Sequence, residues 1–112
     1  MSELIVLNEV QFTGDHIGGS STQLPESLRW IEIDIYVTVS GKYVAEVIGC
    51  SDVEGEVDFI TTHEAGHPAQ LIELLTYKGR LSKPSQQALR AASDNDAKMA
   101  DVYLTKTIRV ID

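Results

Sequence analysis

The clearest feature of the chain is an alternation of hydrophobic and polar side chains between residues 29 and 39. Every second position carries Ile or Val, and the positions between them carry polar or aromatic residues. Because successive side chains of a strand point to opposite faces, this period of two predicts a half-buried β-strand over Arg29–Val39. The inward positions are Ile31, Ile33, Ile35, Val37 and Val39. The outward positions are Trp30, Glu32, Asp34, Tyr36 and Thr38.

Three other segments show a similar alternation and are also predicted strands. They are Leu4–Phe12, Tyr43–Ile48, and a segment that follows a turn near residues 51–55 and runs through about Thr61. Between the first two strands, Thr13–Ser27 is rich in Gly, Ser, Thr and Pro and has no period. We therefore expect a long surface loop there, and loops of this length are more often functional than shorter ones.

The strands before and after Ser40–Lys42 are expected to form a hairpin, because Ser40 and Gly41 interrupt the alternation. A three-residue loop pairs Val39 with Tyr43 and places Glu46 on the outer face. A two-residue loop would turn Glu46 toward the core, so the longer loop is preferred.

The second half of the chain has helical spacing. A first helix is expected to begin at Pro68 and to end at Gly79, since Pro is well tolerated in the first turn and Gly commonly ends helices. Residues 86–92 are expected to form a second helix. Asp94 is the predicted N-cap of a third, residues 95–104, whose apolar face holds Met99, Val102 and Tyr103.

Strands followed by helices predict an α+β fold in one domain, residues 1–112, with a mostly antiparallel four-stranded sheet covered on one face by two or three helices. The strand-rich part is residues 1–61 and the helical part is residues 68–104. Thr105–Ile111 is expected to add a short strand or to be an extended tail. A chain of 112 residues is long enough for one core, and we expect it to fold alone, as a monomer or a homodimer.

Charge is divided unevenly along the chain. The net charge is −8, and residues 1–67 hold twelve acids and two bases, whereas residues 68–112 hold five acids and seven bases. An acidic protein lacks the Lys and Arg side chains that neutralise phosphates, so direct binding to nucleic acid is not expected. A protein partner with a basic surface is the better expectation.

The acids of the strand-rich part predict a partner-binding surface on the open face and edge of the sheet. Aromatic side chains on the same face favour binding, because such residues anchor interfaces. The alternative is that these charges only keep the sheet solvated and prevent it from pairing with other sheets. The candidate residues are Trp30, Glu32, Asp34, Tyr36, Glu46, Asp52, Glu54, Glu56 and Asp58.

Residues 63–67 read His-Glu-Ala-Gly-His, which resembles the zinc-peptidase motif in its letters. That motif needs a continuous helix, and Gly66 together with Pro68 disfavours one here. The preferred interpretation is a strand end, a tight turn and a helix that begins at Pro68, with His67 just before it. His63 and His67 are kept as candidate metal ligands, with His16 as a third, and a zinc-dependent hydrolase is the enzymatic alternative.

Two other features bear on chemistry. Gly14–Ser21 has the glycine spacing of a phosphate-binding loop but lacks its lysine and the helix that should follow, so a ligand-sensing domain is only an alternative. Cys50 is the single cysteine, which excludes an internal disulfide, and we interpret it as a buried, inert thiol.

The leading hypothesis from the sequence is a non-enzymatic protein-interaction module that requires no cofactor. Its size and acidity are typical of small inhibitors or regulators, such as anti-restriction, anti-CRISPR or immunity-type proteins, that occupy a basic site on a partner. The apolar run Leu4–Leu7 is too short for a secretion signal or a membrane span, so a cytoplasmic location is expected.

Overall fold

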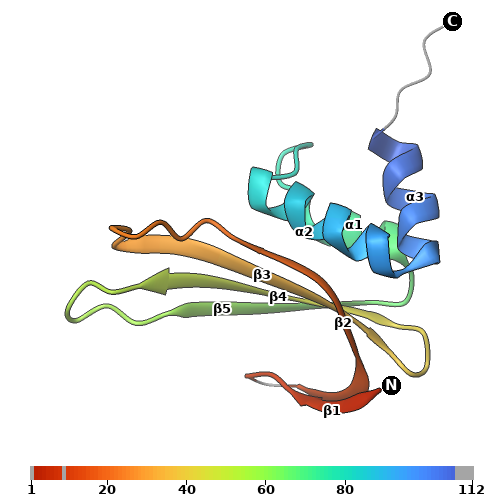
Figure 1. Ribbon diagram of the computed structural model, residues 1–112, viewed down its shortest axis with the longest axis horizontal. Helices are drawn as coiled ribbons and strands as arrows, with labels where there is room; N and C mark the ends of the chain where they lie inside the picture. The colour runs from red at the N-terminus through yellow and green to blue at the C-terminus, as the bar shows by residue number, and fades with distance from the viewer. Residues whose placement is uncertain (1, 9, 108–112) are drawn as a thin grey trace, which may run out of the picture.

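A computed structural model describes the backbone of residues 2–8 and 10–107. It describes the side chains of the same residues up to residue 104. Within this part of the chain, five strands form one antiparallel sheet in the order β1-β2-β3-β4-β5, and three helices follow (Figure 1). The fold is α+β, as predicted, with one strand more than expected. The strands are β1 Glu3–Val6, β2 Gln11–Ser21, β3 Arg29–Thr38, β4 Tyr43–Ser51 and β5 Phe59–Ala65. The helices are α1 Pro68–Leu75, α2 Lys83–Asn95 and α3 Ala97–Thr107.

The N-terminal region differs most from the prediction. Leu4–Phe12 is not one strand, because a turn in which the Leu7 N–H donates to the Val10 carbonyl (2.9 Å) separates β1 from β2. The predicted loop Thr13–Ser27 is also wrong as far as Ser21, since β2 continues to that residue. Its glycines allow close packing: a Cβ at Gly18 would lie 2.7 Å from the Ala88 carbonyl oxygen of α2. The small residues that obscured the strand pattern therefore let a helix lie directly on the strand.

The sheet is curled at β2. The pairing of β2 with β3 shifts between His16 and Gly18, which is a β-bulge, and such bulges bend strands. Figure 1 shows the result: β1 and the first part of β2, which we call the N-terminal arm, lie on the face opposite the helices. The sheet is thus covered on one face by helices and on part of the other by its own N-terminus.

The hairpin of β3 and β4 keeps its predicted faces but has a different register. Val37, rather than Val39, lies opposite Tyr43, and the Thr38 N–H donates to the Lys42 carbonyl at 2.8 Å. The three-residue loop is Val39–Gly41, one residue earlier than predicted, and Gly41 supplies its positive φ of 89°. The partner of Tyr43 is thus two residues earlier in β3 than predicted. Because side chains alternate with a period of two, a shift of two residues leaves every paired side chain on its predicted face.

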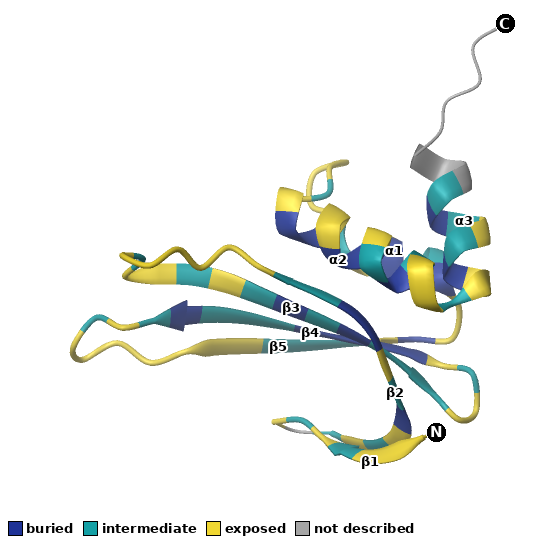
Figure 2. Cartoon of the chain, in the orientation of Figure 1, coloured by how far each residue is buried: buried dark blue, intermediate teal, exposed yellow. Residues whose placement is uncertain are grey.

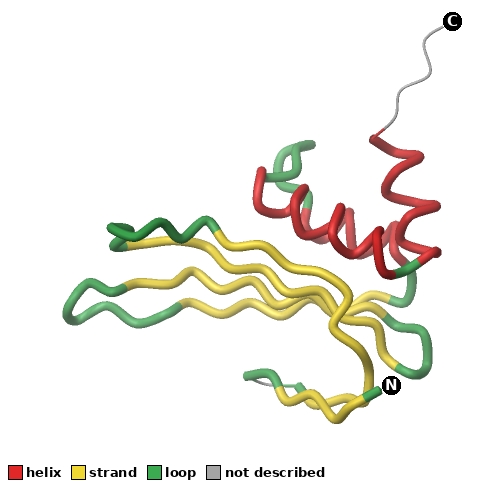
Figure 3. The backbone as a smooth tube through the Cα atoms, viewed as in Figure 1, coloured by secondary structure: helices red, strands yellow, loops and turns green. Residues whose placement is uncertain are grey.

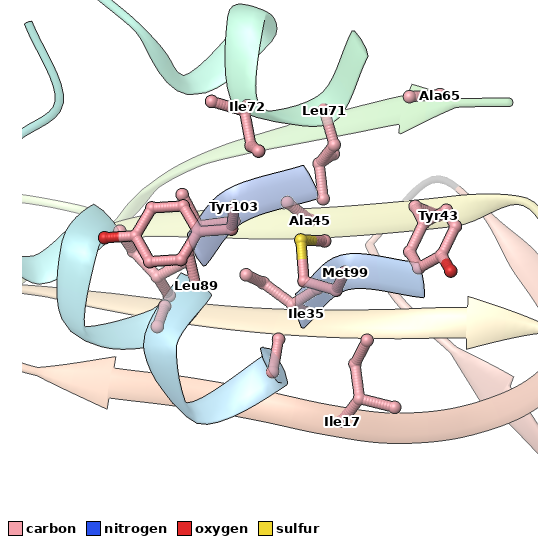
Figure 4. Packing of buried hydrophobic residues seen from close by; sticks show 13 residues of the cluster. Ile17, Ile35, Tyr43, Ala45, Ala65, Leu71, Ile72, Leu89, Met99 and Tyr103 are labelled. Atoms are coloured by element: carbon pink, nitrogen blue, oxygen red, sulfur yellow. The ribbon is translucent and has the colours of Figure 1, made fainter. Parts of the chain in front are cut away.

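The core lies between the sheet and the helices (Figure 4). From the sheet come Ile17, Ile33, Ile35, Tyr43, Ala45 and Ala65. From the helices come Leu71, Ile72, Ala88, Leu89, Ala92, Met99 and Tyr103. Ile33 and Ile35 confirm the predicted inward face, whereas Ile31 is exposed and Val39 is exposed in the loop that follows β3.

The helix boundaries differ from the prediction in ways that local hydrogen bonds explain. α1 ends at Leu75, and Gly79 lies instead in a turn that closes between Tyr77 and Arg80. α2 begins at Lys83, where the Ser82 hydroxyl accepts from the Ser85 N–H (3.2 Å). α2 also runs past Ala92 to Asn95, so Asp94 lies inside α2 and is not an N-cap.

The N-cap of α3 is Asp96, whose carboxylate accepts from the Met99 N–H at 2.9 Å. Met99, Val102 and Tyr103 form its inward face, as predicted. The predicted C-terminal strand is wrong for residues 105–107, which are helical, and its remaining residues lie outside the described part of the chain.

Candidate functional surface

The residues predicted to bind a partner fall into two groups in the structure. Asp34, Tyr36 and Glu46 lie in the middle of the sheet, on the face that the N-terminal arm approaches. The others lie at the end of the sheet farthest from the helices. We call that end the distal tip and define it as residues 22–32 and 49–58.

The central group is a compact cluster of polar and aromatic side chains. Asp34 lies directly opposite Glu46 on the neighbouring strand, and the His16 Nε2 atom lies 2.8 Å from the Asp34 Oδ1 atom. The Tyr36 ring makes edge contacts with His16 (5.2 Å between centroids) and Phe12 (5.5 Å). These side chains bind one another, which reduces what they offer to a partner.

Glu46 is the most buried acid of this cluster, with 9% of its surface exposed. The backbone N–H of Asn8, in the turn of the N-terminal arm, donates a hydrogen bond to its carboxylate. Burial raises the pKa of Glu46, an effect that the Asn8 hydrogen bond opposes and the charge of Asp34 reinforces. The sheet face that was expected to be open is therefore covered at Glu46, whose carboxylate binds the N-terminal arm through Asn8.

Tyr36 is affected by the same surroundings. Burial, together with the nearby charges of Asp34 and Glu46, raises the pKa of its phenol to about 12. The phenol therefore stays protonated at neutral pH and can act as a hydrogen-bond donor, but a tyrosinate nucleophile is not available here.

A hollow of about 270 Å³ lies beside the cluster, between the N-terminal arm and the strands β3, β4 and β5. Its lining includes the apolar side chains of Val10, Phe12 and Val44. At its rim, the Lys42 Nζ atom lies 3.6 Å from the Glu64 Oε1 atom. Both side chains of this pair are largely exposed, so the pair contributes little to stability.

The distal tip exposes hydrophobic side chains in an unusual concentration. The helices do not extend over this end, and its loops are exposed (Figure 2). Four large apolar residues there are at least 40% exposed: Leu24, Leu28, Ile31 and Val57. Ile31 and Val57 line a shallow hollow of about 500 Å³ at the tip, together with residues that include Thr22 and Trp30.

The distal tip also contains six acids and one base, and two of the acids form hydrogen bonds that hold its loops. Arg29 forms a bidentate pair with Glu56 (3.0 and 2.6 Å), which lowers the pKa of Glu56 to about 2. The Asp58 carboxylate accepts from the Ser51 N–H at 3.0 Å. Glu56 and Asp58 therefore order the β4–β5 loop, while Asp52 and Glu54 on the same loop are exposed to solvent.

Trp30 and Glu32 at the tip are linked to each other. The Trp30 indole N–H donates to the Glu32 carboxylate at 2.7 Å, and both residues are partly buried. An aromatic ring whose polar edge is already paired can bury its apolar surface at an interface without leaving a donor unsatisfied.

The two histidines of the zinc-like motif are not on one helix. His63 lies in β5 opposite Ala45, and His67 is the N-cap of α1, where its Nδ1 atom accepts from the Ala69 N–H at 3.1 Å. The predicted strand end, turn and capped helix are therefore present. Within the described residues, no group of three His, Cys, Asp or Glu side chains is arranged to hold a metal ion, and His16 lies in the central cluster.

The remaining candidates have structural roles. Gly14–Ser21 lies within β2 and is not a loop, so it does not form the backbone cradle that a phosphate-binding loop requires. Cys50 is buried, as predicted, and its burial raises the pKa of its thiol above the ordinary value.

Sequence reasoning missed the apolar part of the tip. Leu24 and Leu28 belong to a segment with no period, and no strand or helix pattern gave them a place in the core. Their position in a polar segment without a period could have indicated an exposed apolar site, because an apolar side chain in a polar loop either packs locally or remains exposed.

Comparisons with protein-family models, with curated proteins and with solved structures find no match for this chain. Among the described residues, no helix has the length and apolar character needed to cross a membrane.

Proposed function

We propose that this protein is a non-enzymatic binding module whose distal tip occupies a basic and partly apolar surface of another protein. The observation that carries the proposal is that exposed Leu24, Leu28, Ile31 and Val57 share the distal tip with six acidic residues. Exposed apolar patches rimmed by charge are typical of protein-interaction sites.

The apolar side chains provide the affinity in this proposal. Complete burial of one aliphatic side chain is worth about 1.5–3 kcal/mol, so a few of them can dominate the binding free energy. Leu24 and Leu28 are 68% and 62% exposed, and most of their surface is therefore available to a partner.

The acidic side chains provide the selection of the partner. Asp52 and Glu54 are exposed, and the tip as a whole carries six acids against Arg29. Such a field accelerates encounter with a basic surface and disfavours acidic ones. A small protein that covers a basic site in this way is an inhibitor or regulator, in the manner of anti-restriction, anti-CRISPR or immunity-type proteins.

The alternatives have less support. A zinc hydrolase needs two histidines and a glutamate gathered around one metal, whereas His63 and His67 belong to a strand and a helix cap. A nucleotide sensor built on Gly14–Ser21 needs a flexible loop before a helix, whereas that segment is a paired strand.

The test is affinity capture from the native host with the tip altered. We expect the Leu24→Asp, Leu28→Asp variant to lose the partner that the unaltered protein captures. The matched control is Leu4→Asp, which changes a leucine that is 61% exposed but lies in β1. The captured protein is then purified and titrated with each variant, and we expect a defined stoichiometry with a basic partner. Equal affinity of the tip and control variants would refute the proposal.

A further inference from the structure

The strand β5 forms one edge of the sheet, and within the described residues its outer side pairs with no other strand. Figure 3 shows it as a regular strand along that edge. Exposed edges attract other strands, and natural proteins commonly protect them with Lys, Pro or a bulge. The sequence of β5, Phe59–Ala65, contains no Lys or Pro, and its pairing with β4 has no register shift.

We propose that β5 pairs with β5 of a second copy of this chain, so that two sheets join into one across a two-fold axis. This inference does not depend on the function proposed for the distal tip. In the proposed register Thr62 lies on the axis, opposite Thr62 of the other copy. The remaining pairs are Phe59 with Ala65, Ile60 with Glu64, and Thr61 with His63.

Charge disfavours one of the two neighbouring registers, and the length of β5 disfavours the other. A two-fold axis perpendicular to the sheet pairs residues of the same face, so the alternatives differ by one residue in the position of the axis. An axis at Thr61 would place Glu64 opposite Asp58, two like charges that destabilise a strand pair. An axis at His63 would leave Phe59 and Ile60 without a partner in β5 of the other copy, whereas the axis at Thr62 pairs all residues of the strand. The axis at Thr62 brings no like charges together along β5.

The shape of the edge provides a second, independent argument. Phe59 is 75% exposed and lies on the helix-side face of β5. A hollow of about 460 Å³ beside the other end of β5 is lined by Glu64, Gln70, Glu73 and Leu74. With Phe59 opposite Ala65 of the second copy, the ring lies beside that copy's α1, at the edge of this hollow. Leu74, which is 48% exposed, supplies an apolar contact there, and the axis creates the same contact twice.

The net charge of −8 on each copy opposes the association, because two acidic molecules repel each other. Screening by salt reduces this repulsion. The dimer is therefore expected to become tighter as salt is added, which is opposite to the behaviour expected when the acidic tip binds a basic partner.

The test is sedimentation velocity over a range of protein concentrations and salt, with two variants at one position. Ile60→Lys creates two attractive pairs with Glu64 across the axis, and Ile60→Glu creates two repulsive ones. Both variants remove the same side chain, which is 37% exposed. We expect the dissociation constant of the Ile60→Glu dimer to be roughly tenfold or more above that of Ile60→Lys. Phe59→Ser should also weaken the dimer, whereas the control Val39→Ser should not.

Hydrogen exchange tests the same pairing in the unaltered protein, so its result does not depend on how a substitution affects the fold. We expect exchange of the β5 amides to slow as the protein concentration rises. Three results would overturn the inference: a monomer at all concentrations, equal dissociation constants for the two Ile60 variants, or β5 protection that arises only with a different protein. The Leu24→Asp, Leu28→Asp variant should dimerise normally.

Discussion

Asp34 and Glu46 lie directly opposite each other on β3 and β4, and the backbone of Asn8 covers the second carboxylate. Two acids in adjacent positions, one of them buried, are costly when both are charged. The burial and the neighbouring charge raise the pKa of Glu46 above its ordinary value of 4.5. The folded protein therefore retains a proton on Glu46 at pH values where the unfolded chain has lost it.

The first prediction concerns this residue. Because its folded-state pKa is raised, the contribution of Glu46 to stability is fully present below the unfolded pKa and is lost as pH rises through the folded pKa. Relative to the unaltered protein, Glu46→Gln should therefore become more stable as the pH rises from acidic to neutral. Thermal denaturation of both proteins at a series of pH values measures this change. A difference in Tm that is independent of pH would contradict it.

The second prediction concerns the pair of Arg29 and Glu56. The pKa of Glu56 is lowered from 4.5 to about 2, so its contribution is present above the unfolded pKa and is lost as pH falls toward 2. Since both side chains are exposed, Glu56→Gln should change global stability only slightly. Its main effect should be faster hydrogen exchange in the β4–β5 loop. Exchange in the β3–β4 loop serves as the internal control and should not change.

The third prediction concerns the contact of β2 with α2. Gly18→Ala introduces a methyl group that meets the backbone of Ala88 and Ala92, and neither backbone can move without shifting the helix. We expect the free energy of unfolding to fall by about 2 kcal/mol or more. The control is Gly49→Ala, whose methyl group would lie no closer than 3.7 Å to its neighbours. Urea denaturation of the two variants should separate them clearly.

The fourth prediction distinguishes two nearby aspartates. The Asp96 carboxylate accepts from the Met99 N–H and also from the Tyr43 hydroxyl at 2.6 Å. Asp96→Ala removes the cap of α3 and leaves a partly buried hydroxyl without this acceptor, so we expect a loss of about 2 kcal/mol. Asp94 is exposed within α2, and Asp94→Ala should change stability by less than about 0.5 kcal/mol. Similar losses for both would show that Asp96 has no special role.

The fifth prediction follows from the proposed function of the distal tip. Replacing both Asp52 and Glu54 with their amides should slow association with the captured partner at low salt, by about threefold or more. At high salt the difference should shrink, because exposed charges are screened. Stopped-flow or surface-based kinetics measures both rates. Asp101→Asn, which removes an exposed charge from α3, is the control and should have little effect.

The elements with strong local patterns could be predicted from the sequence. The alternation through Ile33 and Ile35 defined β3, and the parity of the hairpin placed Asp34 and Glu46 on one face. β2 was missed because Gly14, Gly18 and Gly19 carry no side chain that could show a period. Glycine is required at these positions because other segments pack closely against them: Val37 against Gly14, Ala88 against Gly18 and Asp34 against Gly19.

The candidate surface was predictable only in its charges. The acids of the β4–β5 loop were recognised, but the pairing of Glu56 with Arg29 depends on how two loops meet. The burial of Glu46 depends on the bend at His16 and Gly18, which carries the N-terminal arm across the sheet. Contacts of this kind join segments that are distant in the sequence, and they produce no hydrophobic periodicity from which either segment's position could be predicted.

The order of the strands has a consequence for how the protein reaches its folded state. Among the described residues, each strand pairs only with its neighbour in the sequence, and such local pairing is associated with rapid folding. The helix-side face of the sheet, with Ile33 and Ile35, is nevertheless covered only by the helices, all of which follow the strands in the sequence. A nascent chain can therefore assemble its sheet early, but the apolar face of that sheet stays uncovered until the helices have been made. This interval is the stage at which the chain is most prone to aggregation.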